Sequence, residues 1–334
     1  TLNGYPGGVM TNVYLTIDTE YSFALAHGPC PADRAENFAR SIACITPRGP
    51  AGITHKLDLL AWYGQRAVFF VDPMPALVWG VAAIEDVLSP ILRAGQDIQL
   101  HCHTEWLDLA PPESPLAGLS GRNLKDFSFE DQCRILEFAR DMLVAAGAPK
   151  PVAFRAGNYG ANRDTLRALR EIGLSYDSSH TPGIVGGESA LDLRSTDTQP
   201  LIYEGMVEVP VSCVGDIRGG LRHAQVTALS LREMRAALRH ARDSGIASFV
   251  IVSHSFELIN RRSLAVNRVV RHRFEGLCRS LRDLRGIHSA DFTNTPPVRT
   301  VRREEMPAAA PADPVTIGLR YAEQAVSNTL YGAL

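Results

Sequence analysis

Two histidines close a short apolar run in the stretch Asp97-Ile98-Gln99-Leu100-His101-Cys102-His103-Thr104-Glu105-Trp106. In an extended backbone alternate side chains share a face, so His101 and His103 point the same way and Cys102 points away from them. Two imidazoles on one face at the end of a strand are half of a metal site. The stretch therefore predicts a buried strand that delivers two metal ligands, and other parts of the chain have to supply the rest.

Short apolar runs alternate with helical patterns on both sides of this stretch. Strands are expected near residues 13–17, 67–71, 98–100, 152–154, 174–176, 207–211 and 249–252. Helical periodicity covers residues 53–63, 82–93, 129–146, 163–172, 231–243 and 267–284. This alternation predicts an α/β architecture with a parallel sheet. Seven or eight such units without a domain break favour a (β/α) barrel, complete or distorted, over an open sheet.

Polar side chains follow several of the predicted strands directly. They are Asp18 and Glu20 after the first strand, Arg155 and Tyr159 after residues 152–154, and Ser253 and His254 after residues 249–252. Each pair alone has an ordinary explanation, such as a helix cap, a surface ion pair or a hydrogen-bonded core histidine. Because the carboxyl ends of parallel strands meet on one face of a barrel, the pairs are expected to converge with the histidines.

The chain divides into a barrel over residues 11–293, a linker over residues 294–315 and a C-terminal amphipathic helix over residues 316–334. The linker is rich in Pro, Ala and charge. The apolar stripe expected on the helix consists of Ile317, Tyr321, Ala325 and Leu330. Two functions of this helix stay open: it packs back on the barrel, or it forms the contact of a homo-oligomer.

Composition excludes some classes of function. The 334 residues contain 34 basic and 36 acidic side chains, a net charge of −2, which leaves no basic surplus for nucleic acid. No apolar run reaches the roughly 18 residues of a transmembrane helix. The first ten residues do not resemble a signal peptide, and the 6 cysteines are scattered like reduced thiols, so we expect a cytoplasmic protein.

In this order, the motifs resemble those of the polysaccharide deacetylases of the NodB-homology type, carbohydrate esterase family 4. The resemblance covers about residues 14–287. It is carried by Thr16-Ile17-Asp18-Thr19-Glu20, Gly64-Gln-Arg-Ala-Val-Phe-Phe-Val71, Gly95-Gln-Asp-Ile-Gln-Leu-His101, Phe154-Arg155-Ala-Gly-Asn-Tyr159-Gly160, Val207-Glu-Val-Pro-Val-Ser212 and Val250-Ile-Val-Ser-His254. No single motif is decisive, but the ordered set is fairly specific.

The resemblance implies a role for each candidate residue. Glu20, His101 and His103 would bind the metal. The catalytic set would be Asp18 as base, Arg155 orienting Asp18, Tyr159 holding the oxyanion through its backbone N–H, and His254 as acid. The metal would be Zn²⁺, with Co²⁺ and Fe²⁺ also suited to these ligands.

Two departures from the family leave alternatives open. The family places its metal aspartate directly after the catalytic one, where this chain has Thr19, so Asp18 and Glu20 can exchange roles. The family's two histidines are four residues apart, but here they are two apart. A pair that began at His103 would fall on Leu107 and would bring Asp108 into the site.

The expected reaction is removal of an N-linked acetyl or similar acyl group from an amino sugar or saccharide by metal-activated water. Irregular segments 108–126 and 181–204 are candidate walls for a substrate groove. Other metal-dependent hydrolases, phosphoesterases or amidohydrolases, also use a His-x-His pair at a strand end. Metal-free hydrolysis of a cyclic amide and an inactive carbohydrate-binding homologue, suggested by Thr19, are further alternatives.

Overall fold

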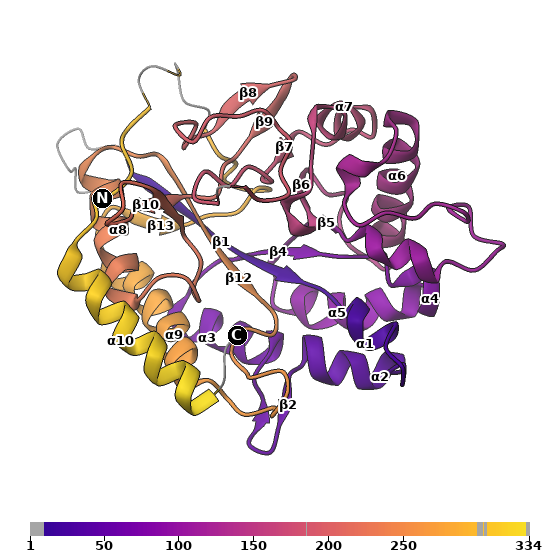
Figure 1. The fold of residues 1–334 in the computed structure, drawn as a ribbon, viewed down its shortest axis with the longest axis horizontal. Coiled ribbons are helices and arrows are strands. Elements are labelled where there is room, and N and C mark those ends of the chain that lie inside the picture. Colours follow the sequence, from indigo (N-terminus) through magenta and orange to yellow (C-terminus); the bar gives the residue numbers. More distant parts are fainter. Residues whose placement is uncertain (1–9, 185, 299–302, 304–305, 332–334) are drawn as a thin grey trace.

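The computed structural model describes residues 10–184, 186–298, 303 and 306–331. Within these residues a curled sheet of nine strands forms the centre, with helices packed on its outside (Figure 1). Its parallel strands follow one another in chain order, and the last returns to lie beside the first. They are β1 (Thr11–Thr19), β4 (Val68–Val71), β5 (Asp97–Cys102), β6 (Ala153–Ala156), β7 (Tyr176–Asp177), β9 (Met206–Glu208) and β12 (Ser248–His254). The predicted α/β fold with a distorted barrel is confirmed.

Two short strands extend this sheet. β8 (Leu201–Tyr203) pairs antiparallel with β9, and β13 (Ile287–Ser289) pairs with the first residues of β1. Two hairpins lie outside it: β2 (Ile45–Thr46) with β3 (Gly49–Pro50), and β10 (Cys213–Gly215) with β11 (Leu221–His223).

The barrel is open between β9 and β12, because no ladder joins these two strands in the part of the chain that the structure describes. The segment after β9 partly fills the opening. The Ser212 N–H donates to the Val250 carbonyl at 3.2 Å, and the Ser212 hydroxyl accepts from the Val250 N–H at 2.9 Å. Further along, Gln225 forms an isolated parallel bridge with Val252. These contacts replace the missing strand pairing.

Helices cover the outside of the sheet. The longer ones are α3 (Ile53–Tyr63), α5 (Val81–Arg93), α6 (Phe129–Ala145), α7 (Arg163–Glu171), α8 (Leu231–Asp243) and α9 (Arg268–Asp283). At the start of α6 the Ser128 side chain accepts from the Asp131 N–H at 3.1 Å, as its sequence predicts, which satisfies one of the free amides of the first turn. Short helices precede α3 and α5: α1 (Phe23–Ala26), α2 (Arg34–Asn37) and α4 (Ala76–Trp79).

The pleat of each strand decides which side chains reach the barrel interior. On β1, Val13, Leu15 and Ile17 pack with the helix-covered core, whereas Tyr14 belongs to a separate cluster inside the barrel. Thr16 and Asp18 share the face of Tyr14 because side chains alternate along a strand. On β5, Ile98, Leu100 and Cys102 pack outside, which leaves His101 on the inner side. Period-two alternation therefore directs the candidate residues to the carboxyl end of the barrel.

A C-terminal helix, α10 (Pro314–Tyr331), lies across the outside of α8 and α9 (Figure 1). The predicted linker lies partly outside the described residues, since residues 299–302 and 304–305 are not described. The predicted apolar stripe is wrong. Ile317 is buried, but Tyr321, Ala325 and Leu330 are exposed, because polar side chains of α10 contact the barrel instead.

None of the helices in the described ranges combines the length and apolarity that crossing a bilayer requires.

Candidate active site

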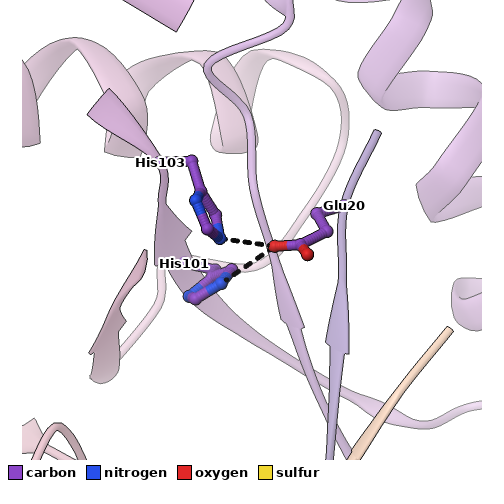
Figure 2. Close-up of side chains that lie close together, drawn as sticks. All are labelled: Glu20, His101 and His103. Atoms are coloured by element: carbon purple, nitrogen blue, oxygen red, sulfur yellow. Dashed lines mark ion pairs between the residues drawn. The ribbon is translucent and has the colours of Figure 1, made fainter. Parts of the chain in front are cut away.

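Glu20, His101 and His103 meet at the carboxyl ends of β1 and β5 (Figure 2). Glu20 Oε2 lies 2.5 Å from His103 Nε2 and 3.3 Å from His101 Nε2. One potential ligand atom from each residue falls within 4.8 Å of the others. The strand that carries the His-x-His pair thus brings both imidazoles to the carboxylate that follows β1.

Hydrogen bonds on the far side of each imidazole define its tautomer. His101 Nδ1 lies 2.7 Å from the backbone carbonyl oxygen of Arg155, and His103 Nδ1 lies 3.1 Å from Glu105 Oε2. A carbonyl or an ionised carboxylate only accepts, so each Nδ1 carries a proton, and Nε2 of each ring, on the side of Glu20, is the nitrogen that could bind a metal. Asn158 donates to the other oxygen of Glu105 at 2.9 Å and fixes that carboxylate in turn.

These residues fit a divalent cation. Glu20 Oε2 is buried, and no neighbour among the described residues makes a hydrogen bond of regular geometry to it, although two imidazole nitrogens are close. Two neutral imidazoles and one carboxylate, with room for further ligands, are a donor set typical of catalytic zinc. Figure 2 shows the three side chains converging on one point.

The charges of the site favour a cation at this point. Burial opposes ionisation of Glu20, but His103 and His101 outweigh it and hold the pKa of the carboxyl well below its usual range. Burial also works against the charged form of His103, but Glu20 and Glu105 outweigh it and raise the imidazole pKa well above its usual range. Without a metal, protonated His103 supplies the positive charge beside the carboxylates of Glu20 and Glu105.

Asp18 lies beside this trio and is held by Arg155. The guanidinium Nη1 donates to Asp18 Oδ1 at 2.7 Å and to Thr16 Oγ1 at 2.8 Å, while Nε donates to the Ser178 carbonyl at 3.1 Å. Arg155 is fully buried and its guanidinium lies 4.5 Å from the centre of the Phe70 ring. A buried ion pair of this geometry fixes the orientation of the carboxylate.

His254 lies on the other side of Asp18. Its Nε2 is 3.8 Å from Asp18 Oδ2, and its Nδ1 is 3.1 Å from Glu257 Oε1. Burial lowers the pKa of His254, but the Glu257 hydrogen bond and the charges of Glu257 and Asp18 outweigh it, and the net pKa is raised. A raised pKa keeps the imidazole protonated to a higher pH, where it can donate its proton.

Lys56 on α3 is linked to Glu257 through the Ser253 hydroxyl. Its fully buried ammonium donates to the Ser253 hydroxyl at 2.5 Å and to the His254 carbonyl at 2.8 Å, and Ser253 donates to Glu257 Oε2 at 2.9 Å. Burial opposes ionisation of Glu257, but His254 and Lys56 outweigh it and lower its pKa to about 2. Gln225, in the segment that fills the barrel opening, also donates to Glu257, at 2.6 Å.

Tyr159 occupies a strained turn next to Asp18. Asn158 and Tyr159 both have left-handed backbones, with φ of 54° and 57°, which cost energy for residues other than glycine. The Tyr159 hydroxyl is buried and has no hydrogen-bond partner among the described residues. Burial raises the pKa of this phenol, so it stays protonated. Strain and an unpaired hydroxyl in one residue are typical of a functional site.

The structure brings all the predicted site residues to one end of the barrel and leaves Asp108 outside. Asp108 is exposed and accepts a hydrogen bond from Ser120 at 2.6 Å. A metal site that began at His103 instead of His101 would therefore lack Asp108 as a ligand. Thr19 faces away from the trio, since its buried hydroxyl donates to the Ile17 carbonyl at 3.1 Å.

Several polar residues of the site were missed from sequence. Asp72 directly follows β4, and its buried carboxylate accepts from the His103 N–H at 3.4 Å, while burial raises its pKa to about 6. The rule that singled out the other strand ends would have found it. Glu105 and Glu257 follow a candidate histidine by two and three residues, which is a detectable signal. Lys56 lies within a helical pattern and offers none.

Comparisons with known proteins bear on the fold. No family model and no curated protein matches the chain. A Mycobacterium smegmatis protein, provisionally assigned as a polysaccharide deacetylase, matches with a TM-score of 0.55 and 22% identity over 90% of this chain and 97% of that one. A GH57-type branching enzyme from Pyrococcus horikoshii matches with a TM-score of 0.51 and 11% identity over 91% and 72%. A family 4 carbohydrate esterase from Streptomyces lividans in complex with acetate gives a TM-score of 0.40 and 13% identity over 91% and 100%.

At these identities the first two matches establish a shared fold. One of the two is described as a deacetylase and the other as a branching enzyme, so the fold alone does not choose the reaction. The choice depends on the side chains at the end of the barrel.

Proposed function

We propose that the protein is a metal-dependent N-deacetylase of the NodB-homology type. It would remove an N-linked acetyl or similar acyl group from an amino sugar or saccharide. One observation carries the proposal. The carboxylate of Asp18, paired with Arg155, and the imidazole of His254, paired with Glu257, lie together beside three side chains that could hold a metal. Amide hydrolysis needs these three functions, a base, an acid and a stabiliser of negative charge.

Glu20, His101 and His103 would hold the metal, with Zn²⁺ the expected ion and Co²⁺ or Fe²⁺ also compatible. A bound divalent cation supplies carbonyl polarisation and a more acidic water. His101 and His103 are positioned for this role by Arg155 and Glu105, which hold their Nδ1 atoms.

Asp18 would accept a proton from the attacking water. Its hydrogen-bonded ion pair with Arg155 fixes Oδ1 and leaves Oδ2 facing His254. As the water oxygen bonds to the acyl carbon, negative charge develops on the carbonyl oxygen. The backbone N–H of Tyr159 would donate to that oxygen, a contribution of about 3 kcal/mol for one such donor.

His254 would donate its proton to the nitrogen as the carbon–nitrogen bond breaks. An amine is a poor leaving group unless it is protonated, so the step needs an acid close to the base. The balance is one water consumed, one proton taken by Asp18 and one proton given by His254, with a carboxylic acid and an amine formed. The acid then gives its proton to the amine, so the products leave as a carboxylate and an ammonium, and proton exchange with solvent restores Asp18 and His254. Glu257 holds His254 in the orientation that this requires.

The two irregular segments expected to line a groove are joined beside the site. Asn123 donates to Glu188 at 3.1 Å, Lys125 lies 3.6 Å from the same carboxylate oxygen, and Asn158 donates to Asn123 at 3.3 Å. We infer that these segments form one wall of the substrate site. Substrates attached to a nucleotide or lipid carrier, and small amides, are the classes to test first.

The rivals have less support. Thr19 favours an inactive carbohydrate-binding protein, because it stands where the family has its metal aspartate. However, Glu20, the residue directly after Thr19, lies within 3.3 Å of both histidines. A phosphoesterase with several metals would need further clusters of ligands, and the described residues contain one three-residue group. Metal-free hydrolysis would not require the three donors to converge.

The test combines metal analysis with acetate release from a panel of N-acetylated sugars, with p-nitrophenyl phosphate as the control substrate. We expect about one zinc per chain and acetate release from at least one sugar. Full metal occupancy in the double variant His101→Ala/His103→Ala would overturn the site, and phosphate release without acetate release would overturn the reaction.

A further inference from the structure

The C-terminal helix α10 presents its polar side chains to the barrel. Arg320 Nε lies 3.1 Å from Glu233 on α8, and Glu323 lies 3.0 Å from Arg273 on α9. Further along, Ser327 accepts from Asn267 at 3.0 Å. Arg320 and Glu323 are the only charged residues between Pro314 and Tyr331 in the sequence, so both charges of the helix are used to attach it.

The face of α10 beside these attachments is apolar and exposed to solvent. Val315 is 72% exposed, Leu319 41%, Val326 53% and Leu330 65%. Ala322 lies among them and is also exposed. A surface helix normally buries such a stripe and shows its polar face to water. This reversed arrangement indicates that another surface covers the stripe.

The spacing of the stripe is that of a helix–helix seam. Steps of four, three, four and four residues lead from Val315 through Leu319, Ala322 and Val326 to Leu330. Steps of three or four residues keep these apolar residues on one side of the helix, along the line where two helices pack.

The stripe is also symmetric along the helix. Positions 315 and 330, and positions 319 and 326, are equally far from the point between residues 322 and 323. A two-fold axis through this point would place Val315 against Leu330 of a second copy, and Leu319 against Val326. Ala322, a small residue, would lie beside the axis, where two helices approach most closely. Such self-complementarity is what an isologous contact requires.

We propose that α10 is the contact of a homodimer in which the α10 helices of two copies pack antiparallel. The one carboxylate beside the seam, Glu323, is paired with Arg273 at 3.0 Å, so its charge is compensated where two identical faces meet. The helix has 18 residues and is about 27 Å long. Pairing two such faces buries on the order of 1,000 Å², the low end of specific interfaces, so the association is reversible.

A lipid surface fits the same face less well. Helices that lie on membranes usually carry Lys or Arg along the polar edge of the apolar face. On α10 the one arginine, Arg320, is buried against Glu233.

The test is sedimentation equilibrium of the full chain over a range of concentrations. We expect mass to rise from one copy towards two. Leu319→Glu and Val326→Lys are each expected to weaken association at least tenfold. The matched control is Asn328→Glu, which adds the same charge at an exposed position off the stripe. All variants are checked for unchanged far-ultraviolet circular dichroism.

The double variant Leu319→Glu/Val326→Lys tests the antiparallel register. In that register each introduced carboxylate faces an introduced ammonium on the other copy, so association recovers relative to either single variant. No recovery would overturn the register. A wild-type chain that stays monomeric at all concentrations would overturn the dimer, and so would binding to anionic vesicles, lost in Leu319→Glu, without self-association.

Discussion

Glu257 holds the imidazole of His254, the group that would donate a proton from Nε2. Glu257 accepts from His254 Nδ1 and raises the imidazole pKa, and its own pKa of about 2 keeps it charged at working pH. Among the groups that raise the His254 pKa, Glu257 has the largest effect, ahead of Asp18 and Glu20.

Replacing this charge tests the role of His254. In Glu257→Gln we expect turnover at pH 8 to fall about 10–100-fold, less than the roughly 100–10,000-fold contribution of a general acid, because the imidazole itself remains. The alkaline limb of the pH–rate profile would move to lower pH, because the His254 pKa loses the charge that raises it. Metal content would stay unchanged. Thr227→Val, which removes only a 3.4 Å contact to Glu257, is the matched control. An unmoved pH profile would contradict the role.

Asp18 and the histidines are separable by a second pair of substitutions. Asp18→Asn should bind metal like the wild type and lose at least about a thousandfold in turnover, since it removes the base but no metal ligand. His101→Ala should lose metal and turnover together. Metal analysis beside acetate release distinguishes the two, and loss of metal in Asp18→Asn would mean that Asp18 and Glu20 have the opposite roles.

At the residue scale, sequence could place Asp18, Glu20, His101 and His103 because strand pleating has a fixed period of two. It could not choose between Asp18 and Glu20, because that choice depends on Arg155, which arrives from a strand 137 residues away in sequence. Lys56 was beyond prediction for the same reason. Its partner Ser253 is 197 residues distant, and a lysine in a helix is ordinarily exposed.

At the element scale, the ends of β7 and β9 bury two carboxyl groups side by side. Asp177 and Glu208 are paired in the sheet register and are fully buried. Burial, and then the charge of Asp177, raise the pKa of Glu208 well above its usual range. One of the two groups therefore keeps a proton in the folded protein at pH values where the unfolded chain has lost it.

This pair predicts how stability depends on pH. A raised folded-state pKa means that the folded state binds more protons, so its contribution is complete below the ordinary Glu pKa of 4.5 and is lost as pH rises towards the folded value. Glu208→Gln removes the proton requirement. Between pH 5 and pH 8 we expect the unfolding free energy of the wild type to fall more steeply with pH than that of the variant. The two slopes should differ by about 1 kcal/mol per pH unit. Urea unfolding at both pH values measures this, and equal slopes would refute it.

Secondary structure was predictable where local signals were strong. Ser128 and Asp131 marked the start of α6, and Gly64 ended α3 with a left-handed backbone at φ of 64°. The orientation of α10 was not predictable, because the apolar side of an amphipathic helix normally faces the body. Partners for Arg320 and Glu323 on α8 and α9 reverse that preference, and they lie 87 and 50 residues away in sequence.

At the scale of the whole molecule, the open side of the barrel is the part that the sequence pattern does not predict. Alternating strands and helices predicted the parallel sheet, but between β7 and β12 the pattern is interrupted by irregular chain. There the barrel is joined by isolated backbone and side-chain hydrogen bonds instead of a ladder. Gln225 forms part of this junction and also donates to Glu257, so closure of the barrel and orientation of His254 share residues.

Ser212 is the residue that tests this closure. Its hydroxyl accepts from the buried Val250 N–H, and removing it in Ser212→Ala leaves that amide unpaired, a cost of about 1–3 kcal/mol. We expect urea unfolding to show this loss and hydrogen exchange to increase in β12, which carries His254, before it increases in β4 or β5. Ser244→Ala, an exposed position after α8, should change stability by less than about 0.5 kcal/mol. Exchange that increases equally in all strands would mean that the opening is not a separate point of weakness, because local opening at the β9–β12 junction should expose β12 first.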